Sequence, residues 1–556
     1  MRFLPASDRA LLIELDGLRE TLALFDTLRD DPVPGVLEAV PAARTILLEF
    51  QPHAVSARQL AAALWQRRAR VADLLRGGGL DAAGRLIELP VRYDGQDLEA
   101  LAEHLGISAA QLIELHTGHE YHAAFAGFAP GFVYLAGNPF GAPVPRLNTP
   151  RTRVPASSVA VAGDFGAVYP QDSPGGWQLL GTTPCSMWDM RRAPPALLQP
   201  GLRVRFVDMA RAARSIHIPG EVQDAPATGA TGEVPTAADD GTRLKVQSAG
   251  VQTLVQDLGR RGQTGMGVSA SGALDRCALR AANRLVGNPG DAAVLENALG
   301  HLRLHCEQGA AVVAVTGADI PVQVLTASGR RIVAGTHRPL ALDAGDTLDI
   351  GAPSAGVRCY VAVRGGLDVA PVLGSRATDT LAAVGPPPLR LGDVLNVGTL
   401  FGPGELHAVQ PGEDMATRRA LPRAGEALVL DVVLGPRTDW FPPETLAVLQ
   451  EQEWTVTPQS NRVGIRLAGE RPLLRTETLH AAELPSEGTV RGALQVPASG
   501  QPVLFLADHP LTGGYPVIGA VAGHHLDLCA QIPVGARLRF NVLEPFAEIV
   551  PPAAVS

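Results

Sequence analysis

The chain has 556 residues, of which 46% are hydrophobic and 19% charged, and its formal net charge is −9 at pH 7. This length exceeds what one hydrophobic core serves, which predicts roughly three to five domains, and the composition excludes a largely disordered protein. The acidic balance argues against nucleic acid as a partner, because phosphate binding needs clustered Lys and Arg. No stretch approaches the roughly 18 consecutive apolar residues of a membrane helix, so no membrane partner is expected.

Residues 1–80 predict a small α+β domain. The runs "ALLIELD" and "ARTILLEF" have strand composition, and Ser56 precedes "ARQLAAALWQRRARVADLL", whose apolar residues have helical spacing. Asp8, Arg9 and Glu14 interrupt the apolar segment that a signal peptide would need. The five cysteines are dispersed without a CxxC spacing, so they are expected to be reduced thiols in a cytoplasmic protein.

Residues 81–215 predict a compact β-rich domain. Ser108 and Gln111 have the spacing of a capping box at the start of a helix. From there to Asp208 turns recur every few residues without a helical period, which is typical of a closed β-barrel. His116, His119 and His122 diverge around a helix axis at three-residue steps, so they are expected on an exposed helix end rather than at a metal site.

The rest of the chain divides at two polar, turn-rich segments, residues 216–241 and 406–426, which predict linkers. Between them, residues 242–405 predict a β-rich domain with one strong helix, "LDRCALRAANRLVGNPG", which begins near Asp275 and ends at Gly287. Residues 427–548 predict a last β-rich domain, in which the adjacent His524 and His525 are expected to point apart. This organisation suggests a fusion of two ancestral proteins.

A repeat links the two halves. "VPASSVAVAGDFGAVYPQDSPGGWQLLG" from Val154 and "VPASGQPVLFLADHPLTGGYPVIG" from Val496 share their VPAS start and a Gly-Gly-aromatic step, and "GLRVRFVD" and "GARLRFNV" follow them. This order predicts an internal duplication. Glycine lets a backbone approach a ligand closely, although a duplicated structural turn explains the pattern about as well. The candidate substrate-binding residues of the two steps are Ser173, Gly175, Gly176 and Trp177, and Thr512, Gly513, Gly514 and Tyr515.

A second candidate region is the loop "TLVQDLGRRGQTGMGVSASGALD" before the predicted helix. Asp257 and Arg260 are predicted to be catalytic and Ser271 to bind substrate, because helix N-termini attract anions and these groups supply charge and hydrogen bonds. Arginines beside glycines often hold carboxylates or phosphates, and equally often brace a turn. The arginines predicted on this basis to bind substrate are Arg364, Arg376 and Arg462.

Several familiar catalytic motifs are absent from the sequence. It has no GxxxxGK[ST] phosphate loop, no HExxH, no GxSxG and no zinc-spaced cysteines, so no metal site is expected. It also has no Met-Lys-Met-type segment for attaching biotin. If ATP is used, its phosphates are not held by a phosphate loop of this chain.

Long segments resemble a known family. "PVRYDGQDLEALAEHLGIS", "GFAPGFVYL" and the first repeat resemble the allophanate hydrolase subunit 1 (KipI-like, carboxyltransferase C/D) family. The loop that contains Asp257, "VRGGLDVAPVLGSRATDT", "SNRVGIRL" and the second repeat resemble the subunit 2 (KipA-like, carboxyltransferase A/B) family. The family's VPAGSV appears here with Ser157 in place of glycine. Its DRQTTGGY begins here at Asp508, which the resemblance makes a catalytic candidate, and His509 follows in place of arginine.

The resemblance implies a β-rich multidomain fold, in which a small N-terminal α+β domain is followed by cyclophilin-like β-barrel domains. It implies fused B and C subunits of an ATP-dependent 5-oxoprolinase. Such a protein opens a small cyclic amide, 5-oxoproline, to L-glutamate, using ATP with Mg and a separate LamB/YcsF-like A subunit; a homo-oligomer is a further expectation. Two alternatives remain open. One is biotin-dependent carboxyl transfer to urea or a similar amide, and the other is a non-catalytic regulator that binds a sensor kinase.

Overall fold

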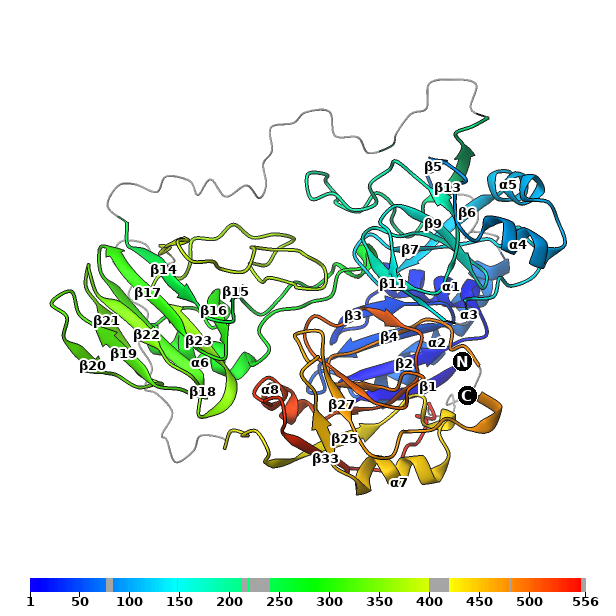
Figure 1. Cartoon of the computed structure of the whole chain (residues 1–556). Helices are drawn as coiled ribbons and strands as arrows, with labels where there is room; N and C mark the ends of the chain where they lie inside the picture. The colour runs from blue at the N-terminus through cyan, green and yellow to red at the C-terminus, as the bar shows by residue number, and fades with distance from the viewer. Residues whose placement is uncertain are drawn as a thin grey trace.

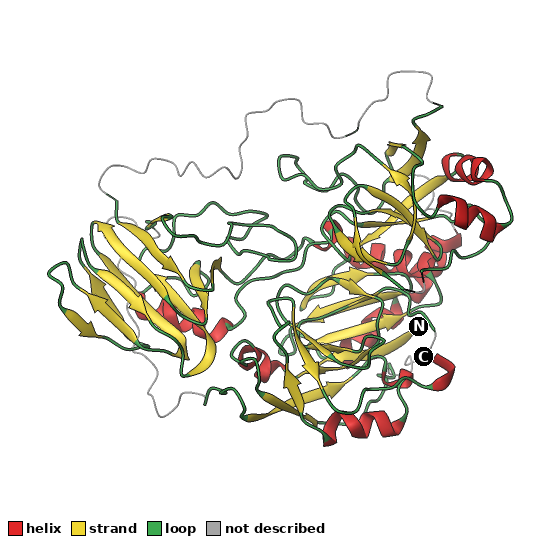
Figure 2. Cartoon of the chain, viewed as in Figure 1, coloured by secondary structure: helices red, strands yellow, loops and turns green. Residues whose placement is uncertain are grey.

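The computed structural model describes residues 1–76, 84–147, 149–211, 219, 241–399, 420–479 and 482–551. Strands dominate throughout and the helices lie on the outside of the sheets (Figure 2), which confirms the predicted β-rich multidomain fold. Both predicted linkers, 216–241 and 406–426, lie mostly outside the described residues. None of the helices in the described parts is long and apolar enough to span a membrane.

The first 76 residues form a four-stranded antiparallel sheet covered on one face by three helices. The helix that follows Ser56 begins with a capping box in which Ser56 and Gln59 bond reciprocally. Along one strand Leu11 and Ile13 pack under the helices while Leu12 faces the other way, as the two-residue period of a strand requires. The strand order is β1-β2-β4-β3, with β1 Arg2–Ser7, β2 Ala10–Glu14, β3 Val36–Pro41, β4 Thr45–Phe50, α1 Leu18–Asp30, α2 Ala57–Gln66 and α3 Arg68–Arg76.

The open face of this sheet packs against the C-terminal end of the chain. Leu4, Leu12 and Leu47 from the sheet share one apolar cluster with Phe505 and Val517. Figure 1 shows the blue N-terminal sheet lying against the orange C-terminal domain. Because burial of apolar surface is the main favourable contribution to docking, the first and last domains of the chain form one packed unit.

Residues 86–208 form the first barrel. Its sheet has the order β12-β9-β10-β7-β6-β13-β5, and an isolated bridge between Arg92 and Thr182 joins its two edges. Ser157, at the position where the family has glycine, adopts a φ of 65°, a conformation that glycine reaches without strain. The elements are β5 Leu86–Val91, α4 Leu98–Leu105, α5 Ala109–Thr117, β6 Glu120–Ala126, β7 Val133–Ala136, β8 Arg151–Val154, β9 Ser158–Ala162, β10 Phe165–Val168, β11 Ser173–Gly175, β12 Gln178–Thr182 and β13 Arg203–Asp208.

Residues 427–542 form the second barrel, closed in the order β25-β32-β29-β30-β27-β26-β33. Its elements are β25 Ala427–Leu434, η3 Thr438–Trp440, α7 Pro443–Glu451, β26 Trp454–Val456, β27 Gly464–Ala468, η4 Glu477–Leu479, β28 Glu487–Gly488, β29 Ala493–Gln495, β30 Val503–Phe505, β31 Thr512–Gly513, β32 Val517–Val521, η5 Gly523–His525, α8 Leu526–Cys529 and β33 Arg537–Val542.

The two barrels share one topology. In each, the first and last strands pair in parallel, β5 with β13 and β25 with β33. In each, the strand after the Gly-Gly-aromatic step pairs with the strand at the corresponding place in the sheet order, β12 with β9 and β32 with β29, although VPAS precedes β9 and follows β29. The duplication predicted from the repeated segments is therefore confirmed.

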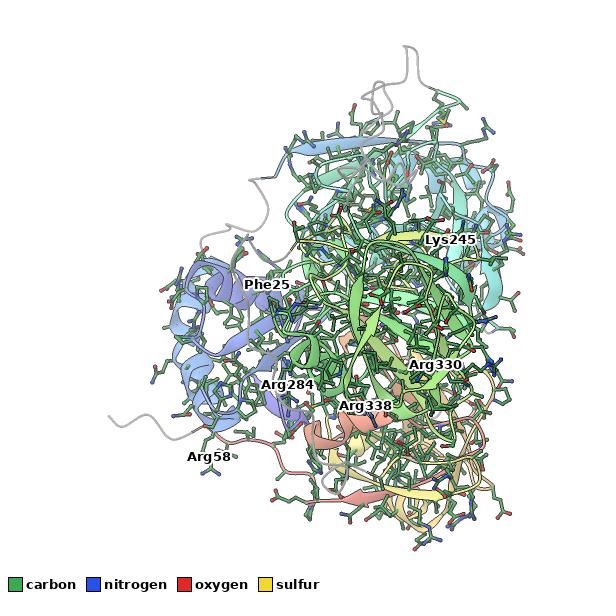
Figure 3. The ribbon with its side chains drawn as sticks, turned by 90° about the vertical axis from the view of Figure 1, so that its left-hand side faces the viewer. Phe25, Arg58, Lys245, Arg284, Arg330 and Arg338 are labelled. Carbon is green, nitrogen blue, oxygen red and sulfur yellow. The ribbon has the colours of Figure 1, made fainter. Side chains whose placement is uncertain are left out.

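Residues 243–397 form a domain of two sheets around one apolar cluster. The predicted helix is α6 (Arg276–Val286); the Asp275 side chain accepts a hydrogen bond from the Ala278 amide, and Gly287 ends the helix with a φ of 77°. Figure 3 faces this domain, with Lys245, Arg330 and Arg338 on its near side. The strand orders are β20-β19-β22-β17-β14-β24 and β15-β16-β23-β18-β21, with β14 Arg243–Ala249, β15 Gln252–Gln256, β16 Val294–Ala298, β17 Leu302–Gln308, β18 Ala311–Asp319, β19 Val322–Leu325, β20 Arg331–Val333, β21 Pro339–Leu342, β22 Thr347–Ile350, β23 Ala355–Val363 and β24 Val394–Asn396; η1 is Thr264–Met266.

One prediction for the first barrel is wrong. His116, expected on an exposed helix end, is fully buried, stacks on Phe206 at 4.4 Å between ring centroids, and bonds to the Tyr93 hydroxyl at 2.7 Å. Burial lowers the pKa of His116 to about 3, so the imidazole is neutral. Periodicity cannot tell a polar helix end from one that packs against a barrel, because both leave the same pattern.

Candidate functional site

A cavity of about 400 Å³ lies where the N-terminal domain, the two-sheet domain and the second barrel meet. The N-terminal domain contributes the turn between β1 and β2 and the end of β4, including Arg9 and Glu49. A volume of this size suits a small molecule. The other polar groups of its wall used below are Arg261, Ser271 and Arg276 from the loop before α6 and its first residue, and Arg491 and His509 from the second barrel.

The loop between β15 and α6, residues 257–275, is the segment that joins these parts. The amide of Gly262 donates to the Glu38 carboxylate on β3, and the carbonyl of Met266 accepts from the Gly131 amide of the first barrel at 2.9 Å. Farther on, the Ser271 hydroxyl donates to Asp508 Oδ1 at 2.7 Å. One loop therefore contacts three other domains and brings Ser271 to the cavity wall.

Behind Ser271 lies a buried charge network that we name the Arg462 network: Arg462, Asp508, Glu296, Ser271 and Thr380. Arg462 holds Asp508 with two hydrogen bonds, Nε to Oδ2 at 2.9 Å and Nη2 to Oδ1 at 3.0 Å. Its third nitrogen, Nη1, pairs with Glu296 on β16. Thr380 donates to Asp508 Oδ2 from both its amide and its hydroxyl, at 2.9 and 2.7 Å. The network ties the two-sheet domain to the second barrel.

Protonation of the network follows from these contacts. Burial opposes ionisation of Asp508, but the Arg462 guanidinium and the hydrogen bonds that the carboxylate accepts outweigh it and hold the pKa of Asp508 below its ordinary value. The two carboxylates in turn raise the pKa of Arg462 despite its burial. Arg462 and Asp508 are therefore both charged at neutral pH.

Asp379 behaves in the opposite way. It is 1% exposed, and burial together with the nearby Asp508 charge raises its pKa to about 6. Its Oδ1 accepts the amides of Leu381 and Ala382, and its Oδ2 accepts the Ser269 hydroxyl at 3.2 Å. Two neighbouring carboxyl groups thus have pKa values displaced in opposite directions, an arrangement that is common at functional sites.

Three predicted residues brace this region, Asp257 and Arg260 from the loop and Arg376 from the two-sheet domain. Asp257 accepts the Ser375 hydroxyl at 2.6 Å and the Arg376 amide at 2.6 Å, so its carboxylate fixes the turn at residues 375–376. Arg376 Nε donates to the carbonyl of Val369, again within the two-sheet domain. Arg260 is 2% exposed and donates through Nη2 to the carbonyl of Ala377. These contacts suit positioning of the loop rather than contact with a substrate.

The predicted charged residues therefore divide into those that reach the cavity and those that lie behind it. Ser271 lines it, whereas Asp508 and Arg462 lie directly behind Ser271. Asp257, Arg260 and Arg376 hold the loop, and Arg364, at the end of β23, does not line the cavity. Sequence analysis missed Arg276, Arg491 and His509. Arg276 stood in the quoted helix segment without a glycine neighbour to single it out, whereas Arg491 precedes Gly492 but lies outside the quoted segments.

The two Gly-Gly-aromatic turns do not form a shared ligand face. Trp177 is 6% exposed and packs in an aromatic cluster with Phe132 and Tyr134, so it belongs to the first barrel's core. Tyr515 is 41% exposed, and neither turn lines the cavity. The predicted substrate-binding residues of the two steps therefore do not lie at this cavity. The remaining residues of the two turns, which also lie outside the cavity lining, are Ser173, Gly175, Gly176, Thr512, Gly513 and Gly514.

These turns instead help the barrels to contact one another. A Cβ atom added to Gly127 of the first barrel would collide with the Thr512 hydroxyl of the second. Close by, the Ser486 hydroxyl donates to the Tyr134 hydroxyl at 3.0 Å. The interpretation of the repeat as a structural turn accounts for these contacts.

His509 supplies a neutral imidazole to the cavity wall. It is 6% exposed, and burial lowers its pKa. Its Nδ1 lies 2.9 Å from the carbonyl of Pro510, which can only accept, so the proton of the neutral ring is on Nδ1. Nε2 then carries a lone pair, and no described residue donates to it. His509 can therefore accept a proton or a hydrogen bond from a molecule in the cavity.

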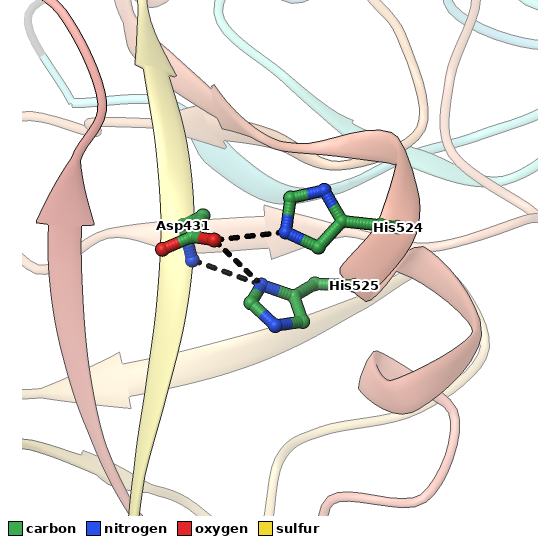
Figure 4. A group of neighbouring side chains, drawn as sticks. All are labelled: Asp431, His524 and His525. Carbon is green, nitrogen blue, oxygen red and sulfur yellow. Dashed lines mark hydrogen bonds and ion pairs between the residues drawn. The ribbon is translucent and has the colours of Figure 1, made fainter. Parts of the chain in front are cut away.

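A separate cluster of His and Asp side chains lies on the second barrel (Figure 4). Contrary to the expectation that they point apart, His524 and His525 both approach Asp431, with His524 Nε2 at 2.8 Å from Oδ2. His525 Nδ1 accepts the Asp431 amide at 3.0 Å, and Asn541 donates to the other carboxylate oxygen. Because the lone pair of His525 Nδ1 is already used, the cluster suits a hydrogen-bonded brace between β25 and η5.

We expect that Asp379→Asn will flatten the pH dependence of stability between pH 4 and 6. In this range the unfolded chain has lost the proton that folded Asp379 keeps, so the free energy of unfolding falls as the pH rises. Since two pH units correspond to about 3 kcal/mol, the variant can gain up to about 3 kcal/mol at pH 7. Its amide oxygen can still accept the two backbone bonds, and its NH₂ group can donate to Ser269.

Calorimetric unfolding from pH 4 to 7 measures this effect, with Asp368→Asn, an exposed carboxylate of the same domain, as the matched control. A variant that loses stability in parallel with the wild type as the pH rises would show that Asp379 does not hold a proton in the folded protein.

Two family models match this chain, one in its N-terminal half and one in its C-terminal half. Residues 1–198 match the family described as carboxyltransferase domain, subdomain C and D, and residues 266–542 match carboxyltransferase domain, subdomain A and B. The chain is 36% identical to the 5-oxoprolinase C subunit of Escherichia coli K12, over 53% of this chain and 90% of that protein. It is 40% identical to the 5-oxoprolinase B subunit of Escherichia coli O157:H7, over 32% of this chain and 79% of that protein.

Two further similarities bear on the arrangement of the domains. The chain is 31% identical to urea amidolyase of Saccharomyces cerevisiae over 54% of its own length, but this covers only 16% of that enzyme. The crystal structure of TTHA0988 is 35% identical and superposes with a TM-score of 0.75 over 96% of this chain and 99% of that one. A single chain with both halves in this arrangement is therefore known from experiment.

Proposed function

Because this chain belongs to the carboxyltransferase-domain family, with subdomains C and D in its N-terminal half and A and B in its C-terminal half, we propose that it is a component of an ATP-dependent 5-oxoprolinase. In this proposal it opens the lactam of 5-oxoproline to L-glutamate together with a separate A subunit. Its five cysteines are free thiols, four of them buried, which supports a place in the reducing cytoplasm.

The observation that carries the proposal is the composition of the cavity wall. Arg9 and Glu49 come from the half similar to the 5-oxoprolinase B subunit, whereas Ser271, Arg276 and His509 come from the half similar to the C subunit. A site assembled from both halves explains why two separate subunits would be needed elsewhere. It also explains why a fusion is advantageous, since a covalent link keeps the two walls at high effective concentration.

For this reaction the chain has to bind a small amide and to transfer protons. A lactam carbonyl is a poor electrophile, and ATP makes it attackable by water when it phosphorylates the amide oxygen. In this chain Asp508 orients the Ser271 hydroxyl, and His509 Nε2 offers an acceptor for a proton of the attacking water. The Arg462 network keeps this wall rigid by joining two domains behind it.

The cavity does not fit the nucleotide itself. A triphosphate with Mg²⁺ needs several uncompensated cationic groups or a phosphate loop. Among the described residues that line the cavity, all arginines but Arg276 have a carboxylate within 4 Å. We therefore place no nucleotide in this cavity and propose that ATP is bound with the participation of the A subunit.

A second candidate function is carboxyl transfer to urea or a similar neutral amide. The similarity of the C-terminal half to part of urea amidolyase favours it. This reaction would need a biotin carrier on another chain, because the sequence has no biotin attachment segment.

A coupled assay separates the two functions. The purified chain, a LamB/YcsF-like A subunit, MgATP and 5-oxoproline are expected to yield L-glutamate, and omission of either protein should abolish it. Activity of separate 5-oxoprolinase B and C subunits in the same assay confirms that the A subunit is competent. If the chain and a competent A subunit form no L-glutamate, the proposal is contradicted. Turnover of urea that requires bicarbonate and carboxylated biotin would favour the second function.

A further inference from the structure

The cavity wall carries an excess of positive charge. Four arginines line it, and three of them have a carboxylate nearby. The pairs are Arg9 with Asp8 at 3.6 Å, Arg261 with Glu49 at 3.7 Å, and Arg491 with Asp527 at 3.6 Å. Within the part of the chain that the structure describes, the fourth arginine, Arg276, has neither an ion pair nor a side-chain hydrogen bond.

Arg276 is nevertheless held in an enclosed position. It is the first residue of α6, its amide donates to Asp527 at 3.1 Å, and its Nε is fully enclosed without a hydrogen-bond partner. Burial and the nearby positive charges of Arg491 and Arg261 lower the pKa of Arg276 to about 10, yet it stays charged at neutral pH. Arg276 as a whole is only partly buried, but an enclosed Nε without a partner is costly, and an anion that binds beside it removes that cost.

The surroundings favour a carboxylate over other anions. One unbalanced cation matches a single negative charge, whereas a phosphate ester carries more than one near neutral pH. A guanidinium and a carboxylate have matching planar geometry and can form two parallel hydrogen bonds. The Ser271 oxygen and His509 Nε2 add polar partners on the same wall for the rest of such a molecule.

We propose that Arg276 binds the carboxylate of the small amide that occupies this cavity. The proposal rests on the proposed function, since 5-oxoproline carries a carboxylate on its lactam ring whereas urea carries none. It deepens that function by assigning substrate selection to one residue. An amide with a carboxylate is selected and a neutral amide is not.

Titration calorimetry on the full chain tests this with four probes: 5-oxoproline, its carboxylate-free analogue 2-pyrrolidinone, acetate, and inorganic phosphate. We expect 5-oxoproline to bind the wild type at least about 10-fold more tightly than 2-pyrrolidinone does, because a charge-assisted bond is lost in the analogue. Arg276→Gln should weaken 5-oxoproline binding by a similar factor. Arg280→Gln, an exposed arginine one turn along α6, is the matched control and should bind as the wild type does.

The variant is expected to fold, because it removes a charge that has no partner in the folded protein. Unchanged binding of 5-oxoproline to Arg276→Gln overturns the proposal while leaving the 5-oxoprolinase function intact. Arg276-dependent binding of phosphate, with none of 5-oxoproline, overturns the choice of a carboxylate. If 5-oxoproline does not bind but acetate binds in an Arg276-dependent way, the carboxylate site is supported and the 5-oxoprolinase function is contradicted.

Discussion

Replacing Arg462 with methionine is expected to lower the free energy of unfolding by about 3–5 kcal/mol and to abolish turnover. Methionine fills similar space, so packing is largely kept, but Asp508 would remain buried without its counter-ion, and Glu296 would keep only Arg358 at 3.7 Å. Both carboxyl side chains are almost fully enclosed, at 0% and 3% exposure. Removing one partner of such a group costs far more than the pair contributes by itself, because the remaining charges are uncompensated.

The dependence on pH distinguishes charge from packing. In Arg462→Met the pKa of Asp508 should rise, so this carboxyl group becomes neutral as the pH falls toward 5 and the stability deficit shrinks. A deficit caused by lost packing would not change with pH. Arg466→Met, on an exposed position of β27, is the control and should differ from the wild type by less than about 0.5 kcal/mol. Equal stability of the two variants at pH 7 would contradict the assigned role of the network.

The second large effect is expected from Arg437→Met, at the contact between the first and last domains. Arg437 lies between Glu487, which it holds through Nε at 2.9 and 3.0 Å, and Glu14 of the N-terminal domain at 3.0 Å from Nη2. The three side chains are at most 8% exposed. Without the arginine the buried Glu487 carboxylate loses its counter-ion and faces Glu14, which keeps its ion pairs with Arg2 and Arg44, so a loss of about 3 kcal/mol is expected here.

This variant should weaken docking of the N-terminal domain and thereby open the cavity wall that carries Arg9 and Glu49. Hydrogen–deuterium exchange is expected to speed up in β1 and β28, which lie at the contact, whereas α2 on the far face of the sheet should keep its protection. Turnover in the coupled assay should fall although Ser271 and His509 are untouched. Arg423→Met, an exposed arginine just before β25, is the control. Normal exchange in β1 with full activity would show that docking does not depend on Arg437.

The sequence predicted those features of the fold that local physics determines. Ser56 and Ser108 cap helices because their spacing to Gln59 and Gln111 satisfies free amide groups within one turn. The repeated blocks predicted two related barrels because a duplicated order of strands keeps the same pairing. Arg462 and Ser271 could be singled out as polar residues near turn glycines, and Asp508 through the family resemblance; the structure joins all three in one network.

The features that the sequence did not predict, above all the cavity and its wall, depend on how the domains dock, and no local sequence pattern encodes docking. The open face of the N-terminal sheet is apolar, but its sequence does not say whether the first or the second barrel covers it. Arg276 and Arg491 come together only because that docking closes a cavity around them. Trp177 shows the converse. Its place after two glycines suggested a ligand site, whereas an aromatic side chain just before a strand is at least as well suited to a core.

The claim on which the account depends is that the small amide is held between the two halves of the chain, in the cavity at the contact of the N-terminal domain and the second barrel. A crystal structure of the protein soaked with 5-oxoproline tests it most directly. We predict density for the ring in this cavity, with the carboxylate within hydrogen-bond distance of Arg276. Density elsewhere, such as against the turns at Trp177 or Tyr515, with the cavity filled only by solvent, would contradict it.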